Sequence, residues 1–338
     1  MKALCLESSG LETLRVADLP DPEPAAGQVL LRMRAAAVGL RDYKVVAGAY
    51  RADAQTRPLI PGGEGVGEVI ALGAGVAGLA PGTRVHPLYY QGWIDGRPAP
   101  ELLARGTLGG PLLHGTFAEY MVVPVDSVVP VPEHIADAAA ATLPFTGLTA
   151  WRAVAEQGGI AAGDVVMIQG TGGVPLLALQ FAKALGATVI VSSKSDDRLA
   201  RARALGADHT INYREAPEWA GVVRELTGGM GADLVLDPGG SVTLAQSIRA
   251  VRPGGTISVF NALSSADIDV HLPYLLGHSV AIHGVNGGSR ASHEAMLELV
   301  HQARIQPVVE SVVPLADAVA AVADAPAAER FGKPCIQI

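Results

Sequence analysis

The chain has 338 residues, of which 49% are hydrophobic and 17% charged, and its formal net charge is -8. This length exceeds what one hydrophobic core usually serves, so we expect two domains, and the composition excludes a disordered chain. The acidic balance disfavours nucleic acid and anionic membranes as partners. Two cysteines, Cys5 and Cys335, are too few for a disulfide scaffold. No apolar run reaches the roughly 18 to 20 residues that a membrane span needs, so we expect a soluble, cytoplasmic protein.

The first third of the chain consists of short β-like runs separated by glycine and proline turns. These runs cover residues 28–37, 65–72, 84–88 and 118–123. Such spacing predicts a compact, mostly antiparallel β domain over residues 1–125. A proline-spaced connector over residues 124–133 and a helical stretch over 136–155 follow.

From residue 165 onward, strand-like and helical runs alternate. The expected strands are residues 165–168, 188–191, 209–211, 234–236, 256–260 and 280–284. The expected helices include residues 174–185, 199–205, 242–251 and 289–303. Strands joined by helical crossovers predict a doubly wound parallel sheet, here over residues 126–285. We expect residues 286–338 to return to the first domain.

The stretch from Val165 to Gly173 reads VVMIQGTGG, a buried strand that runs into a glycine turn and a helix. Gly170 allows a sharp turn, while Gly172 and Gly173 allow backbone N–H groups to approach a pyrophosphate at the positive end of the helix. Thr171 and Val174 belong to the same turn. The context predicts dinucleotide binding, although glycine turns also join strands to helices without a ligand.

Eight short stretches, taken together and in this order, resemble the medium-chain dehydrogenase/reductase superfamily. They are GQVL at 27–30, PGGEGVGEV at 61–69, PGTRV at 81–85, GTFAEY at 115–120, LPFTGLTAW at 143–151, QGTGGV at 169–174, ALGAD at 204–208 and FGK at 331–333. The resemblance implies a GroES-like β domain, a Rossmann domain and hydride transfer in a cleft between them. It also implies a homodimer formed by edge pairing of the sixth Rossmann strand.

The positions of the superfamily's catalytic zinc ligands are held here by Gly39, Gly63 and Phe145, none of which can bind a metal through its side chain. The segment 91–110 contains no cysteine for a structural zinc. We therefore expect no metal, and the resemblance is greatest to the zinc-independent quinone oxidoreductase-like branch. The alternative is a cluster of histidines that includes His86 and His114.

The second Rossmann strand ends in Ser192, Ser193 and Lys194, where NAD sites usually place a carboxylate. These groups, with Arg198 and Tyr213, suit the 2′-phosphate of NADPH and resemble the phosphate pocket of NADPH-using relatives. In the alternative interpretation, Lys194 and Arg198 are solvated charges, and a nearby aspartate binds a ribose hydroxyl.

The resemblance also implies further cofactor contacts at the ends of later strands, at the start of the helix before the Rossmann strands and near the C-terminus. These residues are Thr149, Asp237, Gly239, Asn261, Ala262, Leu263, Asn286, Gly287 and Lys333. Each glycine among them could instead serve only a turn. Pro175 replaces the third small residue of the glycine pattern, which the first turn of a helix tolerates.

For the proton that must follow hydride transfer, the candidates are Tyr50, which matches a tyrosine of the quinone oxidoreductase-like group, and its neighbour Tyr43. Tyrosines in such a domain more often serve packing, and water could supply the proton. Arg41 and Asp42 are expected to form a structural ion pair. The aromatic segment 89–93 could wall an apolar substrate or serve ordinary packing.

The sequence thus favours a zinc-free, NADPH-dependent oxidoreductase that transfers hydride to a quinone or an α,β-unsaturated carbonyl compound. Its partner would be a small, apolar, electrophilic substrate. Two alternatives remain, namely a zinc-free alcohol or ketone oxidoreductase, and a cofactor-binding protein without turnover.

Overall fold

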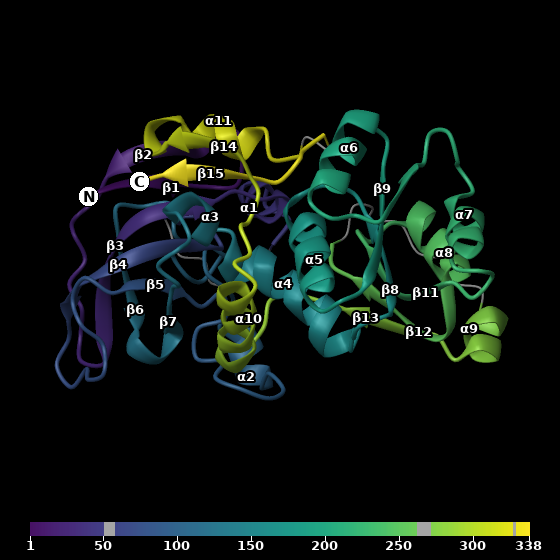
Figure 1. Ribbon diagram of the computed structural model, residues 1–338. Helices are drawn as coiled ribbons and strands as arrows, with labels where there is room; N and C mark the ends of the chain where they lie inside the picture. Colours follow the sequence, from purple (N-terminus) through teal and green to yellow (C-terminus); the bar gives the residue numbers. More distant parts are fainter. Residues whose placement is uncertain (51–57, 262–271, 327–328) are drawn as a thin grey trace. The chain divides into compact units, whose positions relative to one another are not determined.

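A computed structural model describes residues 1–50, 58–261, 272–326 and 329–338, and the chain divides into two compact units (Figure 1). The first unit comprises Met1–Leu148 and Gly287–Ile338, and the second comprises Thr149–Asn286. The expected combination of a parallel α/β sheet and a separate, mostly antiparallel β domain is confirmed. No helix in the described ranges has both the length and the apolar character needed to cross a membrane.

The first unit is built on a seven-stranded sheet with the order β14-β15-β3-β4-β5-β7, in which β6 also pairs with β3. A separate two-stranded sheet consists of β1 and β2. The strands of the unit are β1 (Lys2–Leu6), β2 (Leu14–Asp18), β3 (Gln28–Ala37), β4 (Gly65–Leu72), β5 (Arg84–Pro87), β6 (Tyr120–Pro124), β7 (Val128–Pro130), β14 (Val309–Pro314) and β15 (Lys333–Gln337). Its helices and turns are η1 (Leu11–Thr13), α1 (Leu40–Val46), α2 (Pro100–Ala104), η2 (Val125–Ser127), α3 (Asp137–Ala140), η3 (Leu143–Gly147), α10 (Arg290–Gln302), η5 (Leu315–Asp317) and α11 (Ala318–Ala323).

The long strand β3 shows why this sheet forms. Val29, Leu31 and Met33 are almost completely buried and alternate with the less buried Leu30, Arg32 and Arg34, so they face the core. The alternation places Arg32 on the opposite face. The C-terminal strand β15 pairs antiparallel with β3, so the end of the chain belongs to the first unit.

The second unit contains a six-stranded parallel sheet with the order β10-β9-β8-β11-β12-β13. Its strands are β8 (Val165–Gln169), β9 (Thr188–Ser193), β10 (His209–Asn212), β11 (Ala232–Asp237), β12 (Val251–Val259) and β13 (Ala281–Gly284). Its helices are α4 (Leu148–Trp151), which begins at the unit boundary, η4 (Arg152–Gln157), α5 (Gly173–Ala184), α6 (Asp196–Ala204), α7 (Trp219–Leu226), α8 (Ser241–Ala250) and α9 (Leu272–His278). The strand order reverses between β8 and β11, and ligands of such sheets bind at the carboxyl ends of the strands beside this point.

The two units divide at a different residue from the one that the sequence suggested. The sequence placed the end of the first domain at residue 125, but β7 pairs antiparallel with β5 and the first unit continues to Leu148. The prolines of this segment suggested a connector, yet Pro130 ends an edge strand, where a missing N–H costs no ladder bond. The expected helix over 136–155 is also divided, into α3, η3, α4 and η4.

Candidate active site

The glycine turn of the second unit has the geometry that its sequence predicts. Gly170 has φ +91°, a value that favours glycine, and its N–H donates to the Ser192 carbonyl oxygen at 2.8 Å. Gly172 then caps α5, which begins at Gly173 and includes Val174 and Pro175 in its first turn. A Cβ added to Gly172 would meet no atom within 4 Å, so open space lies beside the amino end of this helix. Such a helix end can hold a phosphate group.

The residues expected to hold a 2′-phosphate gather at the ends of β9 and β10. Ser192 and Ser193 are buried, Lys194 and Arg198 are half-buried, and Tyr213 is 40% exposed. The Tyr213 N–H donates to the Ser193 carbonyl oxygen at 3.2 Å, which fixes the two strand ends beside each other. The group therefore combines two serine hydroxyls and one phenol with two cationic side chains.

One of the two aspartates of the alternative interpretation has a contact within the second unit. Asn212 Nδ2 donates to Asp196 Oδ1 at 2.9 Å, so this carboxylate joins α6 to the end of β10. Both Asp196 and Asp197 are exposed in the first turn of α6.

Asp237, one of the expected cofactor contacts, is held by hydrogen bonds within its own unit. Its side chain is fully buried and accepts hydrogen bonds from Gly239 N at 2.7 Å, Thr243 Oγ1 at 2.8 Å, Ser247 Oγ at 2.6 Å and Gln169 Nε2 at 3.3 Å. These four bonds occupy the carboxylate and hold the turn after β11 against the end of β8. The sequence showed the strand end, but it could not show that the partners lie within the same unit.

The other predicted cofactor residues have different surroundings. Gly239 has φ +77°, and a Cβ there would lie 1.8 Å from the Asn261 carbonyl oxygen, so the turns after β11 and β12 touch. Thr149 and Thr171 are buried, while Asn286 ends the second unit. Ala262 and Leu263 lie outside the described residues. Gly239 and Asn261 thus follow β11 and β12, at the strand ends where the sequence placed them.

Gly287 and Lys333 belong to the first unit. A Cβ at Gly287 would lie 3.1 Å from Tyr89 and 3.4 Å from Tyr90, so the absence of a side chain allows this backbone to approach the two rings. Lys333 is mostly buried, and its Nζ lies 2.9 Å from Glu64 Oε1. Burial alone would lower the pKa of Lys333, but the Glu64 carboxylate outweighs burial and raises it.

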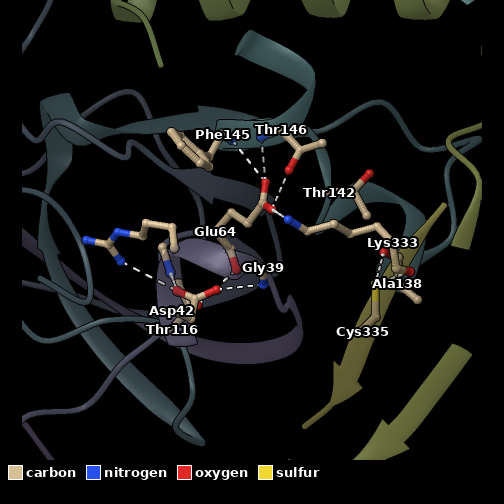
Figure 2. Close-up of polar contacts among 12 residues, drawn as sticks. Gly39, Asp42, Glu64, Thr116, Ala138, Thr142, Phe145, Thr146, Lys333 and Cys335 are labelled. Carbon is tan, nitrogen blue, oxygen red and sulfur yellow. Dashed lines mark hydrogen bonds and ion pairs between the residues drawn. The ribbon is translucent and has the colours of Figure 1, made fainter. Parts of the chain in front are cut away.

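Figure 2 shows the polar cluster around Glu64 in the first unit. Besides the Lys333 ammonium, the Glu64 carboxylate accepts hydrogen bonds from Phe145 N at 3.2 Å, Thr146 N at 2.8 Å and Thr146 Oγ1 at 2.7 Å. Asp42 lies nearby on α1 and accepts from Gly39 N at 2.8 Å (Figure 2). The sequence indicated Glu64 only as the remainder of a metal motif, and the charge pattern gave no sign of its pairing with a lysine 269 positions later, at residue 333.

The three positions that lack metal donors are filled by other groups. A Cβ at Gly39 would lie 2.8 Å from Lys333 Nζ, and a Cβ at Gly63 would lie 3.2 Å from Arg41 Nη1. The Phe145 ring lies against the Tyr89 ring, with centroids 4.2 Å apart. Cationic side chains thus lie next to the two glycines, and an aromatic ring lies next to Phe145.

The aromatic segment is largely packed. Tyr89, Tyr90 and Trp93 are buried and form a small hydrophobic cluster with Leu102 and Phe145. Packing is therefore the better interpretation for most of this segment.

The two candidate proton donors differ in their surroundings. Tyr43 packs against the main hydrophobic cluster of the first unit, so its ring serves packing. Tyr50 is 45% exposed, and the Arg41 guanidinium lies 5.9 Å from its ring centroid. Burial, followed by the neighbouring Tyr89, raises the pKa of Tyr50, so its phenol stays protonated at neutral pH.

Two family models match the chain, an alcohol dehydrogenase GroES-like domain over residues 25–133 and a zinc-binding dehydrogenase over residues 173–302. A zinc-type alcohol dehydrogenase-like protein of Schizosaccharomyces pombe is 34% identical over 91% of this chain and 90% of the relative. The acryloyl-coenzyme A reductase of Metallosphaera sedula is 30% identical over 89% of each protein. The crystal structure of an NAD-dependent alcohol dehydrogenase has 36% identity and a TM-score of 0.90, and 100% of each chain is covered.

The name of the second model raises the question of zinc. Within the described ranges, no group of three or more His, Cys, Asp or Glu side chains could hold a metal ion. Gly39, Gly63 and Phe145 offer no donor, and the lysine and arginine beside the two glycines would repel a cation. The residues present therefore do not fit this metal. The two domain models, the relatives and the fold agree, and the chain belongs to the medium-chain dehydrogenase/reductase superfamily as a pyridine-nucleotide-dependent oxidoreductase of the alcohol dehydrogenase type.

Proposed function

We propose that the protein is an NADPH-dependent reductase of quinones or α,β-unsaturated carbonyl compounds that works without zinc. The observation that carries the proposal is the set Gly39, Gly63 and Phe145, whose surroundings hold Lys333 and Arg41 rather than metal donors. Without a Lewis acid, a saturated alcohol or ketone is a difficult substrate. An activated C=C bond or a quinone is more electrophilic and needs less help.

The comparisons support this substrate class without deciding it. The Metallosphaera sedula relative is named an acryloyl-coenzyme A reductase, and that name describes reduction of an activated C=C bond. Other relatives are named alcohol dehydrogenases, which favours a zinc-free alcohol or ketone oxidoreductase as the second candidate. A substrate panel separates the two. Oxidation of NADPH by a quinone or enone, but not by a saturated ketone, supports our proposal, and the reverse result favours the second candidate.

The preference for NADPH rests on the group at the ends of β9 and β10. Lys194 and Arg198 supply positive charge, and Ser193 supplies a hydroxyl for a 2′-phosphate. The double variant K194A/R198A is expected to weaken NADPH binding by roughly tenfold or more, since a hydrogen bond to a charged group contributes about 1.5–3 kcal/mol. NADH binding should stay within twofold. Tighter binding of NADH by the unaltered protein would overturn the cofactor assignment.

When bound, the reduced nicotinamide supplies a hydride to the electrophilic carbon of the substrate. The chain's own residues must then stabilise the negative oxygen that develops and deliver a proton. Tyr50 is the proposed proton donor because its phenol is half-exposed and its ring lies beside the Arg41 guanidinium. Y50F should lower turnover at saturating substrate by about 100-fold or more if the phenol is the acid. Unchanged turnover would assign the proton to water.

We also propose that the protein forms a homodimer through β13. This strand lies at the end of the sheet order, and Ile282 within it is 37% exposed. An exposed parallel edge is a ready template for pairing with the same edge of another copy. Sedimentation of the protein as a monomer at micromolar concentration would contradict this.

A further inference from the structure

Arg41 is a mostly buried cation whose hydrogen-bonding capacity is only partly used. Its side chain is 10% exposed, and Nη2 donates to Thr107 Oγ1 at 2.6 Å. Nη1 reaches Asp42 Oδ1 only at 3.5 Å, and buried Nε has no partner among the described residues. A guanidinium carries five N–H donors, so several remain available. A buried donor without a partner costs free energy unless a ligand satisfies it.

The carboxylate beside Arg41 is occupied by other donors. Asp42 is buried and accepts from Gly39 N at 2.8 Å and from Gly63 N at 3.2 Å. These bonds hold the two glycine segments in place and leave only the long contact to the guanidinium. The expected structural pair is present, but Asp42 serves the backbone more than it neutralises Arg41.

The guanidinium is held rigidly in a space that glycines leave open. A Cβ at Gly63 would lie 3.2 Å from Nη1, and a Cβ at Gly110 would lie 3.1 Å from Nη2. Tyr89 lies on one side, with its ring centroid 5.2 Å from Arg41 Cζ, and Tyr50 lies at 5.9 Å. Both rings lie within cation–π distance of the guanidinium, and its side chain is only 10% exposed. A mostly buried donor of this kind suits an oxygen that gains negative charge.

Lys333 is the other cation beside these glycines, and its role differs. Its Nζ lies 2.9 Å from Glu64 Oε1, and three further donors also bind the Glu64 carboxylate. The charge of Lys333 is therefore compensated within the protein. Of the two cations, Arg41 is the one with donors to spare.

We infer that Arg41 is a catalytic residue that stabilises the negative oxygen of the substrate, the task that zinc performs in other dehydrogenases. This inference rests on the proposed function. As hydride forms a new C–H bond at the β-carbon, the electron pair of the C=C bond moves toward the carbonyl, and its oxygen becomes an enolate. The guanidinium donates hydrogen bonds to that oxygen. A proton from Tyr50 or water then completes the α-carbon, and the dinucleotide leaves oxidised.

The test compares R41M and R41K with the unaltered protein. In R41M, kcat/KM for an enone with saturating NADPH should fall on the order of 100-fold or more, since loss of one oxyanion donor has an effect of that size. R41K keeps the positive charge but lacks the planar set of guanidinium donors, so its kcat/KM should lie between those of R41M and the unaltered protein. The isotope effect with 4-deuterated NADPH should persist or increase, and NADPH affinity should not change. R330M is the matched control because Arg330 is 17% exposed and bonds Glu310 and Asp324 at 2.8 and 2.7 Å. It should keep the kcat/KM of the unaltered protein.

A binding measurement tests Arg41 independently of turnover. 4-Nitrophenol absorbs differently as phenol and phenolate, so its spectrum on the NADP⁺-loaded protein reports whether the site favours an oxyanion. The unaltered protein and R330M should favour the phenolate, and R41M should lose this preference. If R41M does not fold, the same measurement is made on R41K, which should bind the phenolate with a weaker preference than the unaltered protein.

The outcomes separate the two claims. Turnover in R41M or R41K within twofold of the unaltered protein, with the same phenolate preference, overturns the role of Arg41 and leaves the proposed function standing. If the unaltered protein reduces no quinone or enone, the proposed function fails. In that case a phenolate preference that depends on Arg41 still supports an oxyanion site at this residue, and its absence overturns both claims.

Discussion

The buried histidine pair of the first unit makes a quantitative prediction about acid stability. His86 on β5 and His293 on α10 are fully buried, and Nδ1 of His86 lies 3.1 Å from Nε2 of His293. Burial lowers the pKa of His293 to about 3. Burial, and then the neighbouring His293, also lowers the pKa of His86 well below its usual range. Both rings are therefore neutral in the folded protein at neutral pH.

The sign and size of the effect follow from proton linkage. The unfolded chain binds a proton at His293 below pH 6.5, whereas the folded protein does not until about pH 3, so stability falls as pH drops through this window. Each pH unit below the unfolded pKa costs about 1.4 kcal/mol for one histidine. Between pH 7 and pH 5, His293 should therefore cost about 2 kcal/mol of unfolding free energy. The variant H293Q should not show this part of the loss of unfolding free energy.

Urea unfolding of the wild-type protein and H293Q at pH 7, 6 and 5 measures the difference directly. Carboxylates also titrate toward acid, but they are common to both proteins and cancel in the comparison. Q302N, which changes an exposed and non-titrating residue on α10, should keep the pH dependence of the wild type. Parallel stability curves for the wild type and H293Q would refute the reasoning.

Three further predictions concern other features of the fold. E64Q leaves the buried Lys333 ammonium without its carboxylate and should lower stability by about 3–5 kcal/mol. Adding K333M should restore part of this stability in the double variant E64Q/K333M. Thermal unfolding of both single variants and the double variant measures this, and additive effects would contradict the pairing. G239A places a Cβ 1.8 Å from the Asn261 carbonyl oxygen and should lower both stability and NADPH affinity. G159A, also at a positive φ but with open space around it, is the control for backbone strain alone, and an equal effect on NADPH affinity would contradict the close contact. Burial raises the pKa of Cys335 to about 12 and also raises that of Cys5, so neither buried thiol should react with a thiol reagent at pH 8 before unfolding. Stoichiometric labelling of the native protein would show that the interior opens.

The fold followed from the sequence because its strong signals are local. The run from Val165 to Gly173 combines a buried strand, a positive φ and a helix start, all within one short stretch. The strand β7 was missed because its prolines resemble a connector, and only its pairing with β5 identifies it as part of the sheet. Pairing between distant segments has no local signature.

The candidate site was predictable only in part, for the same reason. Missing donors at Gly39 and Gly63 were evident from the motif positions, but the cations that fill their places come from Lys333, far along the chain, and from Arg41. Asp237 resembled a ligand contact because it ends a strand, whereas its hydrogen bonds lie within the second unit. Burial and partners separate these roles, and neither is visible in a motif.

The most direct test of the account is NADPH oxidation by protein whose metal content is known. The purified protein is dialysed against a strong zinc chelator, its residual metal is measured, and an enone and a quinone are supplied as acceptors. Our account predicts that metal-free protein reduces an acceptor at an undiminished rate and that added zinc does not increase it. Loss of activity on chelation, with recovery when zinc is returned, would contradict it.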